Sequence, residues 1–331
     1  MDKAIRDFFI HLSQNKLLNA GAKRWGLRLG AQSVVAGTNI NEMVESVKKL
    51  NGAGISCTID NLGEFVHEKD EAVKAKNQIL AVIEAIHANE LDAHLSIKPS
   101  QLGLDIAYDF CLQNVEEIVK KANDYNLFVN FDMEDHARLQ ASFDLLDELS
   151  PSYDNIGTVI QAYFFRAKDD IRKYQDYRLR IVKGAYKEDE TVAYQAKNNI
   201  DKNYIELIEW HLLNGKFTSI ATHDHHVIDH VKKFAEKHHI SKDKFEFQML
   251  YGFREDMQHQ LVKEGYQFCT YVPFGEDWYG YFMRRLAERP QNLNLLVKQV
   301  FNKKTNTLIG VGVAGFLLGR LSKRKRKHKE L

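Results

Sequence analysis

Two adjacent arginines, Arg284 and Arg285, stand near the end of the stretch YFMRRLAERPQN. Arg284 and Glu288 are four residues apart, so a helix would place them on one face. Adjacent cations are costly to bury without partners, whereas guanidinium groups suit bidentate binding of a carboxylate or phosphate. Alone, the stretch is typical of a solvent-facing helix. Its position after a dense aromatic segment favours an anion clamp, with Glu288 as counter-charge.

A second pair of cations lies in LRIVKGAY, residues 179–186. Arg180 and Lys183 stand near the end of a β-type run, and Gly184 and Ala185 then allow another molecule to approach the backbone closely. Two cations beside two small residues suit a cofactor phosphate or an electron-rich ring. Ordinary exposed bases at the end of a strand remain the alternative.

Three carboxylates crowd the stretch FDMED, residues 131–135. Asp132 and Glu134 lie on the same side of an extended chain. Such groups can bind a hard metal ion or act as acid and base. Because Lys98 and Arg284 are expected at the same end of the fold, charge pairing is favoured over a metal site.

A histidine cluster, ATHDHH, spans residues 221–226. His223 and His225 resemble a zinc-binding pair, and metal-dependent hydrolases with a barrel fold use such ligands. Those enzymes need further His and Asp ligands at other strand ends, and no other predicted strand ends in His, with His94 only inside its run. We therefore favour contact of Thr222 and His223 with a cofactor, and keep a metal-dependent barrel hydrolase using His223 and His225 as the alternative.

The elements that must position these residues alternate regularly. Short β-type runs are separated by longer segments with helical periodicity. The eight runs are 55–60, 93–98, 127–133, 156–162, 178–185, 218–223, 245–250 and 267–273. Eight β/α units predict an α/β fold, a distorted (β/α)8 TIM-type barrel with N-terminal helices and a C-terminal apolar and basic tail.

Polar side chains stand at or near the end of every predicted strand. They are Asp60, Lys98, Asp132, Gln161, Lys183, His223, Gln248 and Tyr271. In barrels of this type the chemistry lies at the carboxyl-terminal ends of the strands. One polar strand end is ordinary, but eight together predict a mouth built for a ligand.

Composition sets the remaining boundaries. The 331 residues allow one barrel with additions, and a net charge of +1 argues against nucleic acid as a partner. Three widely spaced cysteines indicate a reducing compartment. We predict an N-terminal helical segment at 1–50, a catalytic barrel at 51–302 and a tail at 303–331.

The predicted tail combines an apolar run, residues 308–319, with a cluster of lysines and arginines after it. The run is shorter than the ~20 residues needed to span a bilayer. An apolar segment next to a polybasic patch favours peripheral attachment. We therefore expect a cytoplasmic protein attached peripherally to the inner face of the cell membrane, with a disordered tail as the alternative.

Taken together, these stretches resemble the proline dehydrogenase family, in its short, monofunctional bacterial form. The matching stretches are IKPSQLGLD (97–105), VNFDMED (129–135), VIQAYFFR (159–166), LRIVKGAY (179–186), IATHD (220–224), FEFQMLYG (245–252), and YVPFG with YFMRRLAERPQN (271–292). The resemblance implies FAD-dependent oxidation of L-proline to Δ1-pyrroline-5-carboxylate, the first step of proline degradation. A hydride passes from proline C5 to flavin N5, a membrane quinone accepts the electrons, and a separate pyrroline-5-carboxylate dehydrogenase takes the product.

The resemblance also implies roles for individual residues. Asp132 and Arg180 are the expected catalytic residues, with Asp132 ordering the site and Arg180 near flavin N5. The substrate site comprises Lys98, Arg284 and Arg285 around the proline carboxylate, with Glu288, Ala185, Tyr186, Leu250 and Tyr271. The FAD contacts are Met133, Gln161, Arg180, Lys183, Gly184, Ala185, Thr222 and His223.

Two positions depart from the pattern of the longer, bifunctional relatives. Lys187 stands where a tryptophan is common, and Asp224 stands where an asparagine is common. Neither residue is assigned a role. A third hypothesis, from another class, is a membrane-tethered binding protein that retains the anion clamp without the chemistry.

Overall fold

The computed structural model describes residues 33–63 and 66–288, with side chains described as far as Met283. The chain divides into two compact units. One unit is Val34–Trp278, and the other comprises residues 1–33 and 279–331. Each is described by itself.

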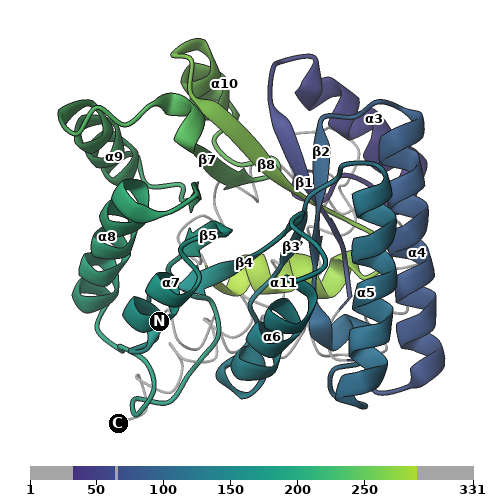
Figure 1. Ribbon diagram of the computed structural model, residues 1–331. Coiled ribbons are helices and arrows are strands. Elements are labelled where there is room, and N and C mark those ends of the chain that lie inside the picture. The colour runs from purple at the N-terminus through teal and green to yellow at the C-terminus, as the bar shows by residue number, and fades with distance from the viewer. Residues whose placement is uncertain (1–32, 64–65, 289–331) are drawn as a thin grey trace, which may run out of the picture. The chain divides into compact units, whose positions relative to one another are not determined.

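The first unit is built on a closed barrel of eight parallel strands in sequence order, β1 to β8, with β8 paired to β1 (Figure 1). The strands are β1 (Ser56–Asn61), β2 (Ala93–Ile97), β3 (Val129–Phe131), β4 (Ile156–Gln161), β5 (Arg178–Val182), β6 (Phe217–Ala221), β7 (Phe245–Leu250) and β8 (Gln267–Phe274). The predicted TIM-type barrel is confirmed. Each predicted run overlaps one strand, and β1, β6 and β8 each extend one residue beyond their runs.

Helices alternate with the strands and surround the barrel (Figure 1). They are α3 (Ile40–Asn51), α4 (Lys69–Ala88), α5 (Tyr108–Asp124), α6 (His136–Leu149), α7 (Ala167–Lys173), α8 (Lys197–Asn214), α9 (His225–Lys237) and α10 (Glu255–Lys263), with short 3-10 helices η3 (Pro99–Leu102) and η4 (Lys242–Lys244). Two helices start directly after strands at capped positions. Asp135 accepts a hydrogen bond from the Arg138 amide, and Asp224 accepts one from the His226 amide.

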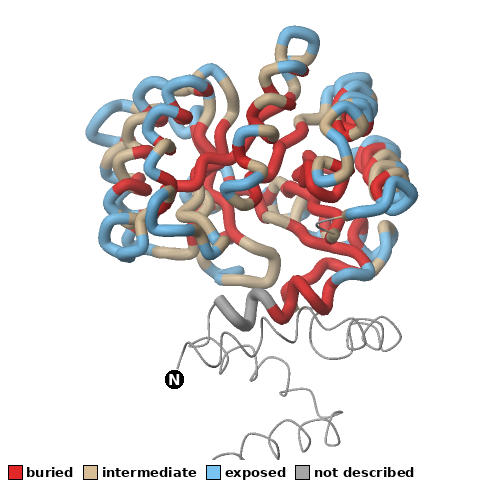
Figure 2. The backbone as a smooth tube through the Cα atoms, turned by 90° about the horizontal axis from the view of Figure 1, so that it is seen from below, coloured by how far each residue is buried: buried red, intermediate tan, exposed pale blue. Residues whose placement is uncertain are grey.

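The apolar core lies between the outer face of the barrel and the helices. On β1, Cys57 and Ile59 are buried on this side, and α4 buries Ile79, Ile83 and Ile86 at helical spacing. Figure 2 shows the consequence, with buried strands in the middle and exposed outer helix faces around them. The outward strand face therefore supplies stability and leaves the inward face available for polar side chains.

The observed bounds of two strands, β3 and β8, affect where site residues lie. Strand β3 has only three residues, so Asp132 and Met133 follow it instead of lying within it. Tyr271 lies within β8, which continues to Phe274. Tyr271 still faces the mouth because it pairs in register with Leu250, the last residue of β7.

The described part of the second unit is Ser33 together with α11 (Trp278–Glu288) after its first residue. The backbone of Arg284, Arg285 and Glu288 is helical, as expected, but their side chains lie outside the described residues. The predicted tail also lies outside them. Within residues 33–63 and 66–288, no helix is long and apolar enough to cross a membrane.

Candidate active site

The barrel interior is lined by polar side chains at alternate strand positions. Barrels of this kind are usually filled by layers of Val, Ile and Leu. Here the buried inner positions are Thr58 and Asp60 on β1, His94 and Ser96 on β2, Asn130 on β3, Arg180 on β5, Ser219 on β6, and Glu246 and Gln248 on β7. Because a buried polar group is costly without a hydrogen bond, this interior requires an extensive network.

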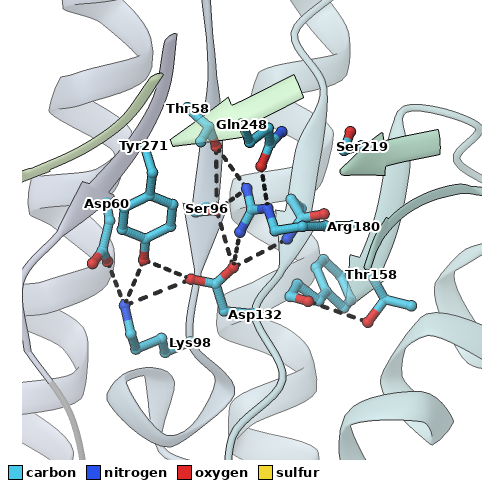
Figure 3. Close-up of polar contacts among 12 residues, drawn as sticks. Thr58, Asp60, Ser96, Lys98, Asp132, Thr158, Arg180, Ser219, Gln248 and Tyr271 are labelled. Carbon is cyan, nitrogen blue, oxygen red and sulfur yellow. Dashed lines mark hydrogen bonds and ion pairs between the residues drawn. The ribbon is translucent and has the colours of Figure 1, made fainter. Parts of the chain in front are cut away.

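Arg180 is the centre of that network (Figure 3). Its Nε donates to Gln248 Oε1 at 2.7 Å, and one terminal nitrogen donates to Asp132 Oδ1 at 2.6 Å. The other terminal nitrogen donates to the hydroxyls of Thr58 and Ser96, at 3.1 and 2.9 Å. Partners from four other strands or strand ends thus hold the guanidinium at all three of its nitrogens. Arg180 as a whole residue is only 5% exposed.

Asp132, directly after β3, accepts four hydrogen bonds and lies near one further cation. Oδ1 accepts from Arg180, from Ser96 Oγ at 3.0 Å and from Asn130 Nδ2 at 3.1 Å. Oδ2 accepts from the Tyr271 hydroxyl at 2.8 Å and lies 3.8 Å from Lys98 Nζ. The carboxylate therefore connects the two cations of the mouth. Asp132 lies near Lys98, as predicted, and also pairs with Arg180, while the predicted pairing with Arg284 lies outside the described side chains.

Lys98, directly after β2, has Asp60 as its nearest partner. Its Nζ donates to Asp60 Oδ1 at 2.5 Å and to the Tyr271 hydroxyl at 3.4 Å. Burial raises the pKa of the Asp60 carboxyl, Lys98 opposes that rise, and Asp132 adds to it. Burial, together with the charges of Asp132 and Asp60, also raises the pKa of Tyr271 well above its usual range, so its hydroxyl keeps its proton and can donate.

A second ion pair lies deeper, at the amino-terminal end of the barrel. Arg178 donates to Glu246 Oε1 at 2.6 Å, and the same oxygen accepts from Ser219 Oγ at 2.7 Å and Gln248 Nε2 at 2.6 Å. The Arg178 guanidinium lies 4.7 Å from the ring centre of Phe128 and 4.8 Å from that of Phe217. Two aromatic rings therefore flank the arginine at this end of the barrel.

The ends of β4, β5 and β6 carry the residues predicted to bind FAD. Gln161 is buried and donates to the Glu134 carbonyl at 2.7 Å. Lys183 is half-buried and pairs with Asp201 at 2.6 Å. Gly184 has φ +111, and a Cβ there would lie 2.4 Å from a ring carbon of Tyr163, so only glycine fits.

This side of the mouth fits a flavin nucleotide. Lys183 and Arg180 supply positive charge for a phosphate and for an electron-rich ring, and the exposed Ala185 adds only a small side chain. Buried Thr222 offers a hydroxyl beside half-buried His223. FAD would be held by the ends of β4 to β6, with Arg180 between it and the rest of the network.

The structure brings together most of the predicted barrel residues and leaves others apart. Asp132, Arg180, Lys98 and Tyr271 form one connected network (Figure 3). Met133 is buried next to it in sequence, Leu250 is half-buried, Ala185 is exposed and Tyr186 is half-buried. The contacts of Arg284, Arg285 and Glu288 lie outside the described residues.

Several members of the network were absent from the predicted site. Thr58, Ser96 and Asn130 gave no sequence signal beyond their place two residues before a polar strand end. Asp60 and Gln248 did give one, since both stand at predicted strand ends. Their partners come from other strands, so only the barrel's closure reveals what they bind.

The histidines of ATHDHH do not form a metal site in this geometry. Across residues 33–63 and 66–288, no cluster of three or more His, Cys, Asp or Glu side chains has metal-binding geometry. Instead, His225 and His226 are exposed on α9 and lie ring to ring at 3.9 Å.

Comparison with known sequences identifies the family. The profile described as "Proline dehydrogenase" matches residues 43–297. "Proline dehydrogenase 2" of Bacillus subtilis is 44% identical over 300 residues, covering 90% of this chain and 99% of the relative. "Proline dehydrogenase" of Deinococcus radiodurans is 41% identical over 286 residues, covering 84% of this chain and 91% of the relative.

Comparison with solved structures supports the fold. A crystal structure of proline utilization A from Bdellovibrio bacteriovorus matches with a TM-score of 0.74 at 24% identity. The match covers 83% of this chain and 34% of that one, so this chain spans about a third of the solved protein. On the profile match and on the long alignments above 40% identity, the chain belongs to the proline dehydrogenase family.

Proposed function

We propose that the protein is a proline dehydrogenase that oxidises L-proline to Δ1-pyrroline-5-carboxylate, the first step of proline degradation, with FAD as its cofactor. Membership of the family supports the activity. The observation that carries the site is the buried network joining Lys98, Asp132, Tyr271 and Arg180 at the mouth. It places two cations on opposite sides of one carboxylate.

Lys98 is the described cation best suited to a substrate carboxylate. Its ammonium group has three donor hydrogens and lies at the strand ends, 7% exposed. Asp60 and Asp132 lie 2.5 and 3.8 Å from its Nζ and hold it from two sides. Arg284 and Arg285 complete the proposed clamp, and Glu288 is their proposed counter-charge. Three cations on one carboxylate fix the orientation of the proline ring.

Tyr271 and Asp132 align the site around the ring. The Tyr271 hydroxyl is held by Asp132 and Lys98, so its ring is fixed across the mouth. Leu250, Ala185 and Tyr186 form the proposed walls. A rigid pocket of this kind excludes water from the reacting C5 carbon and keeps it in one position.

When bound, FAD would supply a two-electron acceptor for the hydride lost from proline C5, while the proline nitrogen would lose a proton and a C=N bond would form. Arg180 is the proposed cation beside the reacting part of the flavin, where negative charge develops as it is reduced. Asp132 fixes Arg180 through their 2.6 Å bond. Met133, Gln161, Lys183, Gly184, Thr222 and His223 are the remaining proposed FAD contacts.

The proposed partners follow from the reaction. A quinone accepts the electrons, and a separate pyrroline-5-carboxylate dehydrogenase consumes the product. Since quinones reside in membranes, attachment of the basic tail to the inner face of the cell membrane would bring enzyme and acceptor together. Truncation after residue 306 tests this last point, because it should weaken binding to anionic vesicles while leaving activity with a soluble electron acceptor.

The experiment for the activity uses the purified full chain, supplied with FAD, in the absence of oxygen. Addition of L-proline should bleach the flavin absorption band and produce pyrroline-5-carboxylate, detected by mass spectrometry. A bound flavin that proline does not reduce would favour a binding protein. A colourless protein that contains stoichiometric zinc and takes up no FAD would favour the hydrolase and contradict the proposal.

A further inference from the structure

The uncharged side chain of Gln248 connects the two ends of the barrel interior. It links the ion pair at the amino-terminal end, which we call the base, to Arg180 at the mouth. Its Oε1 accepts from Arg180 Nε at 2.7 Å, and its Nε2 donates to Glu246 Oε1 at 2.6 Å. Gln248 is 3% exposed and Glu246 is also 3% exposed. Both hydrogen bonds therefore lie in the desolvated interior, where they are strong and their loss is costly.

The two partners determine the orientation of the Gln248 amide. A guanidinium can only donate hydrogen bonds, and an ionised carboxylate can only accept them. The amide oxygen must therefore face Arg180, and the amide nitrogen must face Glu246. Glutamate at this position would set two carboxylates against each other, and methionine would satisfy neither partner.

Glu246 is itself anchored. Its Oε1 accepts from Arg178 and from Ser219 Oγ as well as from Gln248. Arg178 is in turn flanked by the rings of Phe128 and Phe217. Gln248 thus connects the Arg178–Glu246 pair at the base to the Arg180 guanidinium at the mouth.

Gln248 also binds the Nε atom of Arg180, with which the other described residues at the mouth form no hydrogen bond. Asp132 binds one terminal nitrogen, and the hydroxyls of Thr58 and Ser96 bind the other. Among the described residues, Gln248 is the hydrogen-bond partner of Nε. Without it, the guanidinium keeps its bonds to Asp132, Thr58 and Ser96 and stays buried, but it loses the contact that fixes its Nε edge.

We propose that Gln248 is a positioning residue that acts through Arg180 and sets how strongly Arg180 stabilises the reduced flavin. This inference rests on the proposed function, because it requires a flavin beside Arg180. Gln248 touches neither substrate nor cofactor in this account. Its effect should appear in the equilibrium of flavin reduction and in the rate of reduction, and hardly in the affinity for proline.

The test compares Gln248→Met with Gln258→Met in FAD-loaded protein. Gln258 is a matched control: it is 2% exposed, donates to the Phe253 carbonyl at 2.6 Å and accepts from Thr270 Oγ1 at 2.8 Å, away from Arg180. Gln248→Met should lower the two-electron equilibrium constant of flavin reduction about tenfold, or about 30 mV in midpoint potential. The proline concentration giving half-maximal reduction should change less than threefold. Gln258→Met should leave the potential unchanged.

A double-mutant cycle separates positioning from a general structural effect. Arg180→Lys keeps the charge but has no Nε for Gln248 to hold. Adding Gln248→Met to Arg180→Lys should therefore cause no further fall in the equilibrium constant. If Gln248→Met lowered the equilibrium constant of flavin reduction tenfold both in wild-type protein and in Arg180→Lys, the inference would be overturned.

A second variant covers the case in which Gln248→Met does not fold. The exchange of Gln248→Glu with Glu246→Gln conserves volume, net charge and the pairing of donors with acceptors, but it brings the carboxylate against Arg180. It should lower the equilibrium constant of flavin reduction at least threefold. A folded exchange variant with the wild-type potential would overturn the inference. Wild-type protein whose flavin is not reduced by proline would instead overturn the proposed function itself.

Discussion

The barrel interior contains two ion pairs of similar chemistry at opposite ends, and they are held differently. At the mouth, Asp132 contacts Arg180 and Lys98 within a network that includes Tyr271 (Figure 3). At the base, Arg178 pairs with Glu246 between two phenylalanine rings. One set lies around the carboxyl-terminal strand ends, whereas the other lies at the amino-terminal end, where two aromatic rings flank the arginine.

The difference separates charges placed for a ligand from charges placed for the fold. At the mouth, Lys98 is only 2.5 Å from Asp60, yet it lies at the open end of the barrel, where a carboxylate can join its partners. At the base, Arg178 lies between two phenylalanine rings with its side chain 24% exposed, at the amino-terminal end of the barrel and away from the strand ends that form the mouth. We therefore expect mouth variants to change catalysis and base variants to change stability.

The largest expected effect is that of Asp132→Asn. The substitution keeps the shape but removes the charge that holds Arg180 and Lys98, so both cations lose a buried partner. By analogy with the loss of one electrostatic contact in other active sites, the rate of flavin reduction should fall roughly 10²–10³-fold. Anaerobic stopped-flow absorbance measures it, with circular dichroism to verify folding. A rate within threefold of wild type would remove Asp132 from the mechanism.

Arg178→Met is the corresponding change at the base. Glu246 would be left buried without its cation, which typically costs about 3–5 kcal/mol of unfolding free energy. Denaturant unfolding measures the loss. Adding Glu246→Gln should restore part of the stability because it removes the uncompensated charge. If Arg178→Met raised the half-saturating proline concentration while leaving stability intact, the division between mouth and base would be wrong.

Lys98→Met tests whether the mouth cation serves the substrate. Loss of a charge-assisted bond of about 1.5–3 kcal/mol should raise the half-saturating proline concentration roughly 10- to 100-fold. The variant leaves Asp60 buried without its cation, so the control is Lys98→Met combined with Asp60→Asn. This pair should recover stability but not proline affinity. Recovery of affinity would show that Lys98 acts only by neutralising Asp60.

The smallest expected effect is a pH dependence at the base. Burial, with the charges of Arg178 and Arg180, holds the pKa of His94 well below its usual value of about 6.5. The folded state therefore keeps His94 neutral, and stability present above pH 6.5 is lost as the pH falls from there towards the folded pKa. His94→Gln should reduce that loss by up to about 1.4 kcal/mol per pH unit. The measurement is the unfolding free energy as a function of pH. If it fell equally steeply below pH 6.5 in wild type and in His94→Gln, the prediction would be contradicted.

Local patterns predicted the fold because each strand and helix carries its own signal. The apolar runs and helical periodicities indicated eight units, and closure of the barrel by β8 on β1 followed from their number. Strand ends were less predictable. β3 stops at Phe131, so the polar residues from Asp132 onwards lie in a loop.

The candidate site was predictable in its residue types but not in its pairings. Asp60 and Lys98 are 38 residues apart, and Arg180 and Gln248 are 68 apart, so no local pattern connects them. The strand register brings them together: Arg180 pairs with Ser219, and Ser219 pairs with Glu246, two residues before Gln248. The arginines of the proposed clamp stay a prediction from the sequence.

The most direct test of the division between mouth and base is anaerobic flavin reduction by L-proline in Asp132→Asn and Arg178→Met, measured side by side under conditions where both are folded. The division predicts that Asp132→Asn slows reduction at saturating proline at least 100-fold, while Arg178→Met stays within about tenfold of wild type. Equal slowing in the two variants, or a near wild-type rate in Asp132→Asn, would contradict it.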